Sequence, residues 1–179
     1  MRYRRLRAAG GIYAFTVVTR ERKPIFVDEK SVALLLAVVA DIQQRRPFVV
    51  DAYAILPDHA HMGWTLPDGD SDFSTRMMLV KKSFTRLYRD RICPRRMVAM
   101  VRSKSSPVWQ NRFWEHLVSD DRDYIAQIEY IHQNPVRHGL VAMPIEWPHS
   151  SFRGFVELGD YPANWENRDL PDAHGAFGE

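Results

Sequence analysis

The chain has 179 residues, of which 45% are hydrophobic and 26% are charged, and this composition is typical of one globular domain with its own core. No apolar stretch approaches the roughly 20 residues of a membrane span, and the single cysteine, Cys93, excludes an internal disulfide and a cysteine-rich zinc site. The basic N-terminus lacks the apolar segment of a signal peptide, so we expect a cytoplasmic protein.

The net charge of +3 conceals an uneven distribution along the chain. Residues 76–104 hold ten Lys or Arg and a single acid, and the first seven residues hold four arginines. From Glu157 to the end there are six acids and one arginine. Basic segments of this density favour polyanions, so nucleic acid is the first partner to consider. A solvated helix face is the alternative interpretation of any one basic run.

The first half of the chain predicts the order strand, helix, strand, strand. The strands are indicated by β-branched and aromatic residues, and the helix by an N-cap at Asp28 and by Pro47, which ends it. Pro57-Asp58 predicts a tight connection between two antiparallel strands. The expected ranges are strand 12–19, helix 28–46, strand 48–56 and strand 59–66.

The second half predicts a helix, a strand and a last helix. Residues 92–107 combine proline, serine and basic residues, which predicts a loop. Asp120 or Asp121 is expected to cap the last helix, and Pro135 to end it at Asn134. The expected ranges are helix 71–90, strand 108–118 and helix 121–134, and the chain after about Phe155 is expected to pack poorly.

This order of elements predicts an α+β fold, a ferredoxin-like antiparallel sheet flanked by helices. We expect one domain over residues 1–156, followed by an acidic tail over residues 157–179. Two interpretations of the tail stay open. It folds back over the basic surface and competes with DNA, or it is a disordered segment that keeps the protein soluble.

Two pairs of polar residues predict a site for metal-assisted phosphoryl transfer. His59 and His61 stand two apart in a predicted strand, so both imidazoles lie on one face and can reach the same metal ion. Tyr130 and Asn134 stand four apart in a predicted helix and also share a face. Two histidines on a strand are by themselves more often surface or core residues than ligands, and the tyrosine and the amide strengthen the prediction.

The motifs around these residues form an ordered series that resembles a known family. They are LPDHAHM (56–62), VWQNRFW (108–114), YIHQNPVRHGLV (130–141) and WPHSS (147–151). The series resembles the single-tyrosine HUH transposases. It looks most like the branch associated with repetitive extragenic palindromes (REP) in bacterial genomes, the REP-associated tyrosine transposases. The resemblance runs from about Gly11 to Phe155 and implies the HUH nuclease fold.

The resemblance also implies a role for each residue of the site. His59, His61 and Asn134 become ligands of a divalent metal, Mg²⁺ or Mn²⁺, and Tyr130 becomes the nucleophile on single-stranded DNA. Attack by Tyr130 would link it to a 5′-phosphate and release a 3′-hydroxyl that can rejoin DNA. Related insertion-sequence transposases usually have glutamine at the position of Asn134. Gln133 is the second choice as ligand, because its side chain leaves the helix about 100° away from that of Asn134.

Other polar residues have weaker claims on the site. Tyr124 competes as nucleophile, but it lies well round the helix from Tyr130 and Ile128 follows it at i+4, so core packing is expected. Contacts with DNA or with the core are expected for His116, His132, His138 and His149, and help with the metal or with proton transfer for Glu115 and Glu129.

Basic residues are the expected contacts with DNA phosphates. The resemblance implies a DNA hairpin with a short single-stranded flank, which the loop 92–107 could reach across. Trp109, Phe113 or Trp114 could stack on unpaired bases, although aromatic residues in strands more often belong to the core. The predicted DNA contacts are Arg4, Arg5, Arg76, Lys81, Lys82, Arg86, Arg89, Arg95, Arg96, Arg102, Lys104, Arg112 and Arg137.

Two other functions stay open. One is a module that binds hairpin DNA or RNA without cutting it, against which the intact histidine pair and tyrosine argue. The other is a metal-dependent phosphohydrolase of small substrates, which leaves the basic loop unexplained. We expect a monomer in preference to a dimer, with no required protein partner and no membrane association.

Overall fold

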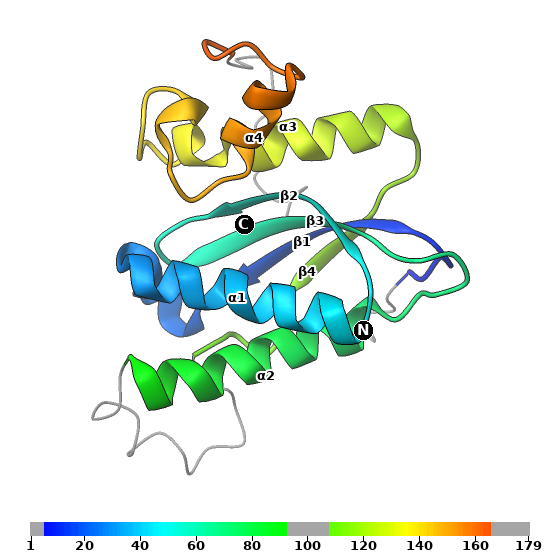
Figure 1. Cartoon of the computed structure of the whole chain (residues 1–179), viewed down its shortest axis with the longest axis vertical. Helices are drawn as coiled ribbons and strands as arrows, with labels where there is room; N and C mark the ends of the chain where they lie inside the picture. The colour runs from blue at the N-terminus through cyan, green and yellow to red at the C-terminus, as the bar shows by residue number, and fades with distance from the viewer. Residues whose placement is uncertain (1–5, 93–107, 166–179) are drawn as a thin grey trace.

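The computed structural model describes residues 6–92 and 108–165 (Figure 1). The elements are β1 (Ile12–Val18), η1 (Arg20–Arg22), η2 (Ile25–Val27), α1 (Glu29–Arg45), β2 (Val49–Ile55), β3 (His59–Thr65), α2 (Phe73–Arg91), β4 (Trp114–Leu117), α3 (Asp121–Arg137), η3 (Pro144–Glu146) and α4 (Phe152–Leu158). The four strands form one sheet in the order β2-β3-β1-β4, and every neighbouring pair is antiparallel. The order β-α-β-β-α-β is that of the ferredoxin-like fold, so the predicted α+β class is confirmed.

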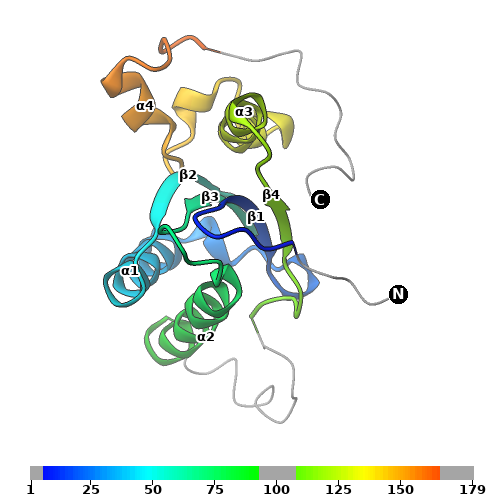
Figure 2. The same cartoon turned by 90° about the vertical axis from the view of Figure 1, so that its right-hand side faces the viewer.

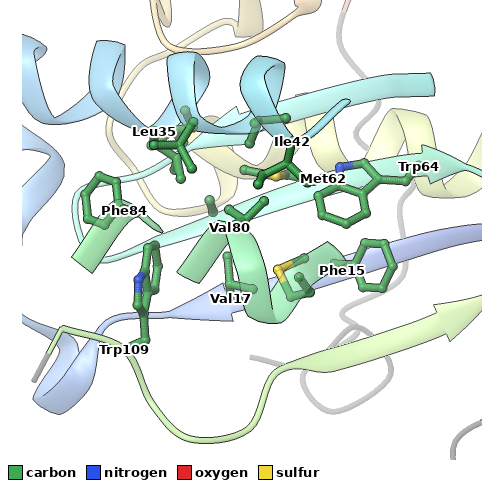
Figure 3. Packing of buried hydrophobic residues seen from close by; sticks show 14 of the residues in the cluster. Phe15, Val17, Leu35, Ile42, Met62, Trp64, Val80, Phe84 and Trp109 are labelled. Atoms are coloured by element: carbon green, nitrogen blue, oxygen red, sulfur yellow. The ribbon is translucent and has the colours of Figure 1, made fainter. Parts of the chain in front are cut away.

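Helices cover both faces of the sheet. α1 and α2 lie on one face, and α3 and α4 on the other (Figures 1 and 2). Side chains alternate along each strand, so Phe15, Met62 and Trp64 point toward α1 and α2 and form the main core there with Leu35 and Phe84 (Figure 3). The intervening residues of β3, which include both histidines, therefore face α3.

Three helices begin at an aspartate whose carboxylate accepts a backbone N–H of the first turn, as expected for an N-cap. The pairs are Asp28 with Lys30, Asp72 with Thr75, and Asp120 with Asp123. The cap at Asp28 is confirmed, and Asp120 is the one that caps the last helix. α2 begins two residues later than predicted because Asp72 caps it. None of the helices in the described ranges combines the length and the apolar character of a membrane-spanning segment.

The fourth strand is shorter than predicted. It begins at Trp114, whereas the aromatic pattern predicted a strand from Val108. Trp109 makes one isolated bridge with Thr19 at the end of β1 and is buried between Phe26 and Phe84. Its indole fills the core beneath the sheet, and the backbone leaves the ladder to place it there.

α3 continues past the proline that was expected to end it. Pro135 lies inside the helix, which runs to Arg137, and His138 is the C-cap. A proline in a helix removes one backbone hydrogen bond. Here the loss falls in the last turn, where the N–H of His138 still donates to the carbonyl of Asn134 at 3.0 Å. The extra residues keep the helical register beyond Asn134 and carry Arg137 back to the side of Tyr130.

The segment after α3 folds back along the outer strand β2. Ser150 forms a bridge with Ala54, and the indole N–H of Trp147 donates to the carbonyl of Ile55 at 3.0 Å. The WPHSS motif thus pairs with one edge of the sheet and holds α4 beside α3.

Two aromatic rings pack beyond Phe155, so the prediction of poor packing there is wrong for Tyr161 and Trp165, whereas residues 157–160 and 162–164 are exposed. The ring of Tyr161 lies 5.6 Å from that of Phe152 and 4.6 Å from that of Trp165. Aromatic contacts of this kind offset the entropic cost of ordering a terminal segment. The rest of the acidic tail, residues 166–179, lies outside the described residues.

Arg76 does not face DNA, so its predicted role is wrong. It is 2% exposed and pairs with the carboxylate of Asp70 at 2.7 Å. Its guanidinium also donates to the backbone carbonyls of Arg46, Pro47 and Asp72. A helix pattern alone could not distinguish this residue from its exposed neighbours. Arg76 ties the end of α1 to the start of α2.

Replacing Arg76 with methionine is expected to lower the free energy of unfolding by about 2–3 kcal/mol, because three backbone carbonyls and the partly exposed carboxylate of Asp70 lose their shared donor. Urea denaturation would measure the change. Arg45→Met is the matched control: Arg45 pairs with Asp41 at the surface, and about 0.5 kcal/mol is expected there. Equal losses in the two variants would contradict the structural role of Arg76.

Candidate functional site

The four residues of the predicted site come together between β3 and α3. The imidazole centroids of His59 and His61 lie 4.9 Å apart, and that of His61 lies 5.6 Å from the ring centroid of Tyr130. His59, His61 and Tyr130 are each 2% exposed, and Asn134 is fully buried. The strand and the helix therefore present one buried polar cluster, and the roles assigned to its members stay predictions.

Small residues on the sheet allow α3 to approach the histidines. Ala52 and Ala54 of β2 pack against Ile131 of α3 in a second, smaller apolar cluster. Gly63 faces the same helix, and a Cβ there would lie 3.6 Å from Cδ1 of Ile131. Ala54 is also the register partner of His61, so the side chain beside that imidazole on β2 is small. This packing sets the short distance between the helix and β3.

Each imidazole is held by a neighbour through its Nδ1 atom. Nδ1 of His59 donates to the carboxylate of Asp58 at 2.6 Å, and Nδ1 of His61 lies 3.1 Å from Oγ1 of Thr16. Burial lowers the pKa of His59, and the bond to Asp58 offsets this only in part. A neutral imidazole with Nδ1 engaged presents Nε2, the form that binds a metal ion.

Two buried polar atoms of the cluster fit a divalent metal. Within the described ranges, Nε2 of His59 and Oδ1 of Asn134 have no hydrogen-bond partner, although burial without one is costly. The amide nitrogen of Asn134 donates to the carbonyl of Tyr130 at 2.9 Å, so the oxygen is the group that remains for a ligand. The amide oxygen is a ligand type that Mg²⁺ and Mn²⁺ prefer, whereas imidazole nitrogen is more usual for softer divalent metals, so the choice of Mg²⁺ or Mn²⁺ stays a prediction.

The choice between two amides as the third ligand stays open. In residues 6–92 and 108–165 no three His, Cys, Asp or Glu side chains are grouped as a metal site, so a third ligand would be of another type. Oε1 of Gln133 is also buried without a hydrogen bond, as is Oδ1 of Asn134. Both oxygens are available on the buried side of α3.

Sequence reasoning missed two neighbours of the cluster. Asp58 was taken only as a turn residue, but its place directly before His59 was a signal that it could orient that ring. His138 was predicted to contact DNA or the core; its ring centroid lies 4.9 Å from that of His59. The signal for His138 was its place one turn after Asn134, which becomes visible once α3 continues through Pro135.

Other candidates are placed away from the histidines. Glu115 is the register partner of Phe15 and so lies on the opposite face of the sheet, which makes its predicted part in metal binding wrong. Tyr124 packs against the smaller apolar cluster, as expected. Glu129 lies near Tyr161, whose pKa is raised to about 12 by burial and, next, by that carboxylate.

The remaining histidines have structural partners. His132 is fully buried, its Nε2 lies 2.8 Å from Oγ of Ser151, and burial lowers its pKa to about 4. His116 lies 2.8 Å from the carboxylate of Asp123. His149 packs against the ring of Trp147. The prediction that these three are not ligands agrees with these contacts.

Apart from buried Arg76, the predicted DNA contacts fall into three groups. The guanidinium of Arg137 lies 5.3 Å from the ring centroid of Tyr130, and Arg112 is exposed. A second group lines a groove beside α2: Lys81, Lys82, Arg86 and Arg89. The third group lies outside the described residues: Arg4, Arg5, Arg95, Arg96, Arg102 and Lys104. Trp109 belongs to the core, so it is not available for stacking.

Comparison with known proteins identifies the family. The family model described as "Transposase IS200 like" matches residues 9–134. The chain belongs to the IS200-like transposase family. A REP-associated tyrosine transposase of Escherichia coli (strain K12) is 37% identical to this transposase over 163 residues, covering 91% of this chain and 89% of that protein. A putative REP-associated tyrosine transposase of Haemophilus influenzae is 36% identical over 169 residues, 94% and 95% of the two chains.

Solved structures agree with this assignment. A REP-associated tyrosine transposase bound to a REP hairpin superposes with a TM-score of 0.84 at 36% identity, covering all of this chain and 97% of that one. A putative transposase from Deinococcus radiodurans has a TM-score of 0.51 at 17% identity, covering 71% and 93%, and supports the fold alone. The predicted membership of the REP-associated branch and the predicted HUH fold are confirmed.

Proposed function

We propose that this transposase is a metal-dependent endonuclease and strand transferase for single-stranded DNA that acts through a phosphotyrosine on hairpins of repetitive palindromes. The observation that carries the proposal is the buried cluster of His59, His61, Asn134 and Tyr130, in which a metal-binding nitrogen and oxygen lack partners within the described ranges. The relative with a TM-score of 0.84 is bound to a REP hairpin, which supports hairpin DNA as the substrate. We propose that the protein acts as a monomer.

Tyr130 would act as the nucleophile. Its hydroxyl oxygen forms a bond to the scissile phosphorus and loses its proton, while the bond from phosphorus to the 3′-oxygen breaks and that oxygen gains a proton. The products are a 5′-phosphate ester on Tyr130 and a free 3′-hydroxyl. Attack by a 3′-hydroxyl on this ester reverses the reaction, so strand transfer, and not net hydrolysis, follows from the covalent intermediate.

The other residues of the cluster would prepare the phosphate for attack. A Mg²⁺ or Mn²⁺ ion held by His59, His61 and Asn134 would polarise the scissile phosphate and stabilise its growing negative charge. Asp58 fixes the orientation of His59. Arg137 keeps a permanent positive charge beside the ring of Tyr130, where it can contact a DNA phosphate.

The test uses the purified full chain, Mg²⁺ or Mn²⁺, and labelled single-stranded hairpins drawn from palindromes near the gene. A denaturing gel detects the protein–DNA adduct, and the chelator EDTA provides the metal-free control. A metal-dependent adduct is the expected result. Hairpin binding without an adduct would favour a binding module that does not cut, and the absence of both binding and cutting would count against nucleic acid as the substrate.

Asp58→Asn is expected to weaken Mn²⁺ binding and cleavage by about 10–100-fold, because the ring of His59 loses a charged acceptor. Titration calorimetry without DNA would measure metal affinity, and the adduct gel would measure cleavage. Asp41→Asn removes the same charge from the surface of α1 and is expected to change neither. If the two variants bind Mn²⁺ equally well, Asp58 does not support the metal site.

A further inference from the structure

The loop between β1 and α1 holds two consecutive residues in a strained backbone conformation. Glu21 and Arg22 have φ angles of 59° and 49°. Within residues 6–92 and 108–165 they are the only residues other than glycine with a positive φ. The left-handed region is unfavourable for L-residues, and glycine, asparagine or aspartate is its usual occupant. Strain of this kind persists where the surrounding structure requires it, and it is more frequent at functional sites.

The same loop is fixed against the turn between β2 and β3. The N–H of Thr19 donates to the carbonyl of Asp58 at 2.8 Å, and the N–H of Phe26 donates to the carbonyl of Pro57 at 2.9 Å. Thr19 is fully buried and Phe26 is 1% exposed, so both anchors belong to the interior. Arg22 lies between these two anchors in the chain. The loop therefore holds the Pro57-Asp58 turn through its backbone and places Arg22 beside Asp58.

Arg22 and His59 share the carboxylate of Asp58. Oδ1 of Asp58 accepts the Nδ1–H of His59 at 2.6 Å, and Oδ2 accepts from Nη1 of Arg22 at 3.3 Å. A carboxylate held through one oxygen alone can rotate about its last bond, whereas a partner on each oxygen fixes its plane. The side chain of Arg22 is 49% exposed, so the ion pair adds little to stability by itself. Its effect is on the orientation of Asp58.

We propose that Arg22 is a positioning residue of the metal site, which acts through Asp58 to hold His59 with Nε2 turned toward the metal ion. The inference deepens the proposed function and rests on it in one respect, that His59 binds a divalent metal. Partners that orient a metal ligand from behind set metal affinity nearly as strongly as the ligand itself. The strained backbone at Arg22 is then explained, because it directs the guanidinium toward Asp58.

The sign of the expected effect separates this role from a purely electrostatic one. The guanidinium is a permanent cation, so its charge alone disfavours a second cation nearby. If Arg22 acted only through its charge, removing that charge would strengthen Mn²⁺ binding. If Arg22 fixes Asp58, the same change weakens Mn²⁺ binding, because the ring of His59 loses its fixed orientation. The two roles therefore predict opposite changes in metal affinity.

Titration calorimetry with Mn²⁺ and the full chain, without DNA, measures this change. Arg22→Gln is expected to weaken Mn²⁺ binding about tenfold. Arg22→Lys keeps one charged donor for the single contact with Asp58 and is expected to restore binding to within about threefold of the wild type. Lys23→Gln is the matched control, because it removes the same charge from the same loop, where Lys23 pairs with Glu21. Unchanged or stronger Mn²⁺ binding in Arg22→Gln would overturn the proposal.

A double-mutant cycle tests whether Arg22 acts through Asp58. When Arg22→Gln is added to Asp58→Asn, less than about twofold further loss of Mn²⁺ affinity is expected, since both substitutions break the same contact. If the two losses multiply, Arg22 acts independently of Asp58 and the proposal is overturned. Loss of hairpin affinity with unchanged Mn²⁺ binding would make Arg22 a DNA contact and overturn it as well.

Arg22→Gly separates a role in the site from a role in the fold. Glycine adopts a positive φ without strain, so this variant is expected to unfold at a higher urea concentration than Arg22→Gln. Its Mn²⁺ binding is expected to be as weak as in Arg22→Gln, because both lack the guanidinium. If both variants unfold at clearly lower urea concentrations than the wild type and lose Mn²⁺ binding in proportion, Arg22 supports the fold and the proposal is overturned.

A last readout needs no metal and separates this inference from the proposed function. At alkaline pH, ¹⁵N NMR of the metal-free chain reports which imidazole nitrogen of His59 carries the proton, and His59→Ala identifies the resonances. The wild type is expected to carry it on Nδ1, and Arg22→Gln to show a mixture of tautomers. If the wild type binds no Mn²⁺ and forms no adduct while Arg22→Gln still mixes the tautomers, the proposed function fails and the positioning role stands. Mn²⁺ binding and adduct formation that Arg22→Gln leaves unchanged, with one tautomer in both chains, reverse that conclusion.

Discussion

Tyr130→Phe is expected to abolish the protein–DNA adduct and to lower strand cleavage by at least about 10⁴-fold. The substitution removes only the hydroxyl, the atom that would form the bond to phosphorus. The ring keeps its contacts with His61 and Arg137, so fold and hairpin affinity are expected to persist. The measurement is an adduct gel beside a binding titration on the same labelled hairpin.

Tyr124→Phe is the matched control for this prediction. Tyr124 lies on the same helix but packs against the smaller apolar cluster, and burial raises its pKa, which makes it a poorer nucleophile. Full adduct formation is expected in this variant. An adduct that survives Tyr130→Phe and disappears with Tyr124→Phe would transfer the role of nucleophile to Tyr124.

His59→Ala is expected to lower cleavage by about 10³-fold or more and to abolish Mn²⁺ binding. Removal of the metal with EDTA is expected to lower cleavage by the wild type to the same extent. The substitution removes a buried Nε2 that has no hydrogen-bond partner within the described residues, and Asp58, which loses the bond from Nδ1, keeps Arg22 as a partner. The chain is therefore expected to stay folded while the metal site loses one of three ligands. Mn²⁺ titration followed by calorimetry and the adduct gel would measure the two losses.

Two neighbouring amides provide the comparison for the metal site. Asn134→Ala is expected to behave like His59→Ala, and Gln133→Ala like the wild type, because Asn134 is the predicted third ligand. The reverse result would assign the third ligand to Gln133, whose oxygen is also buried without a partner. Undiminished cleavage by His59→Ala in the presence of EDTA would remove the metal from the mechanism.

Short-range periodicity accounts for what could be predicted of the site. The alternation of a strand places His59 and His61 on one face, and the helical repeat places Asn134 one turn after Tyr130. These relations hold within one element, so they survive in any tertiary arrangement that keeps the element intact. The structure adds the contact between the two elements, which small residues such as Ala54 and Gly63 make possible.

Relations between distant segments could not be predicted in this way. Arg76 stands among exposed basic residues in the sequence, yet its burial depends on the end of α1 and on Asp70. Trp109 is buried in the core, and the residues that follow it line the groove beside α2 together with residues about thirty positions earlier in the chain. Glu115 is the one buried position of β4, and only the register with Phe15 shows which face of the sheet it occupies.

The sequence by itself determined the family, the α+β fold and the four residues of the candidate site, because motifs and local periodicities are properties of the chain. The tertiary structure decided which polar groups are buried and which reach solvent, that α3 continues through Pro135, and that His138 and Asp58 adjoin His59. The physical reason is that burial and hydrogen-bond satisfaction depend on segments far apart in the chain. Whether a given polar group is buried and hydrogen-bonded is therefore decided only when the sheet and its two helical layers pack together.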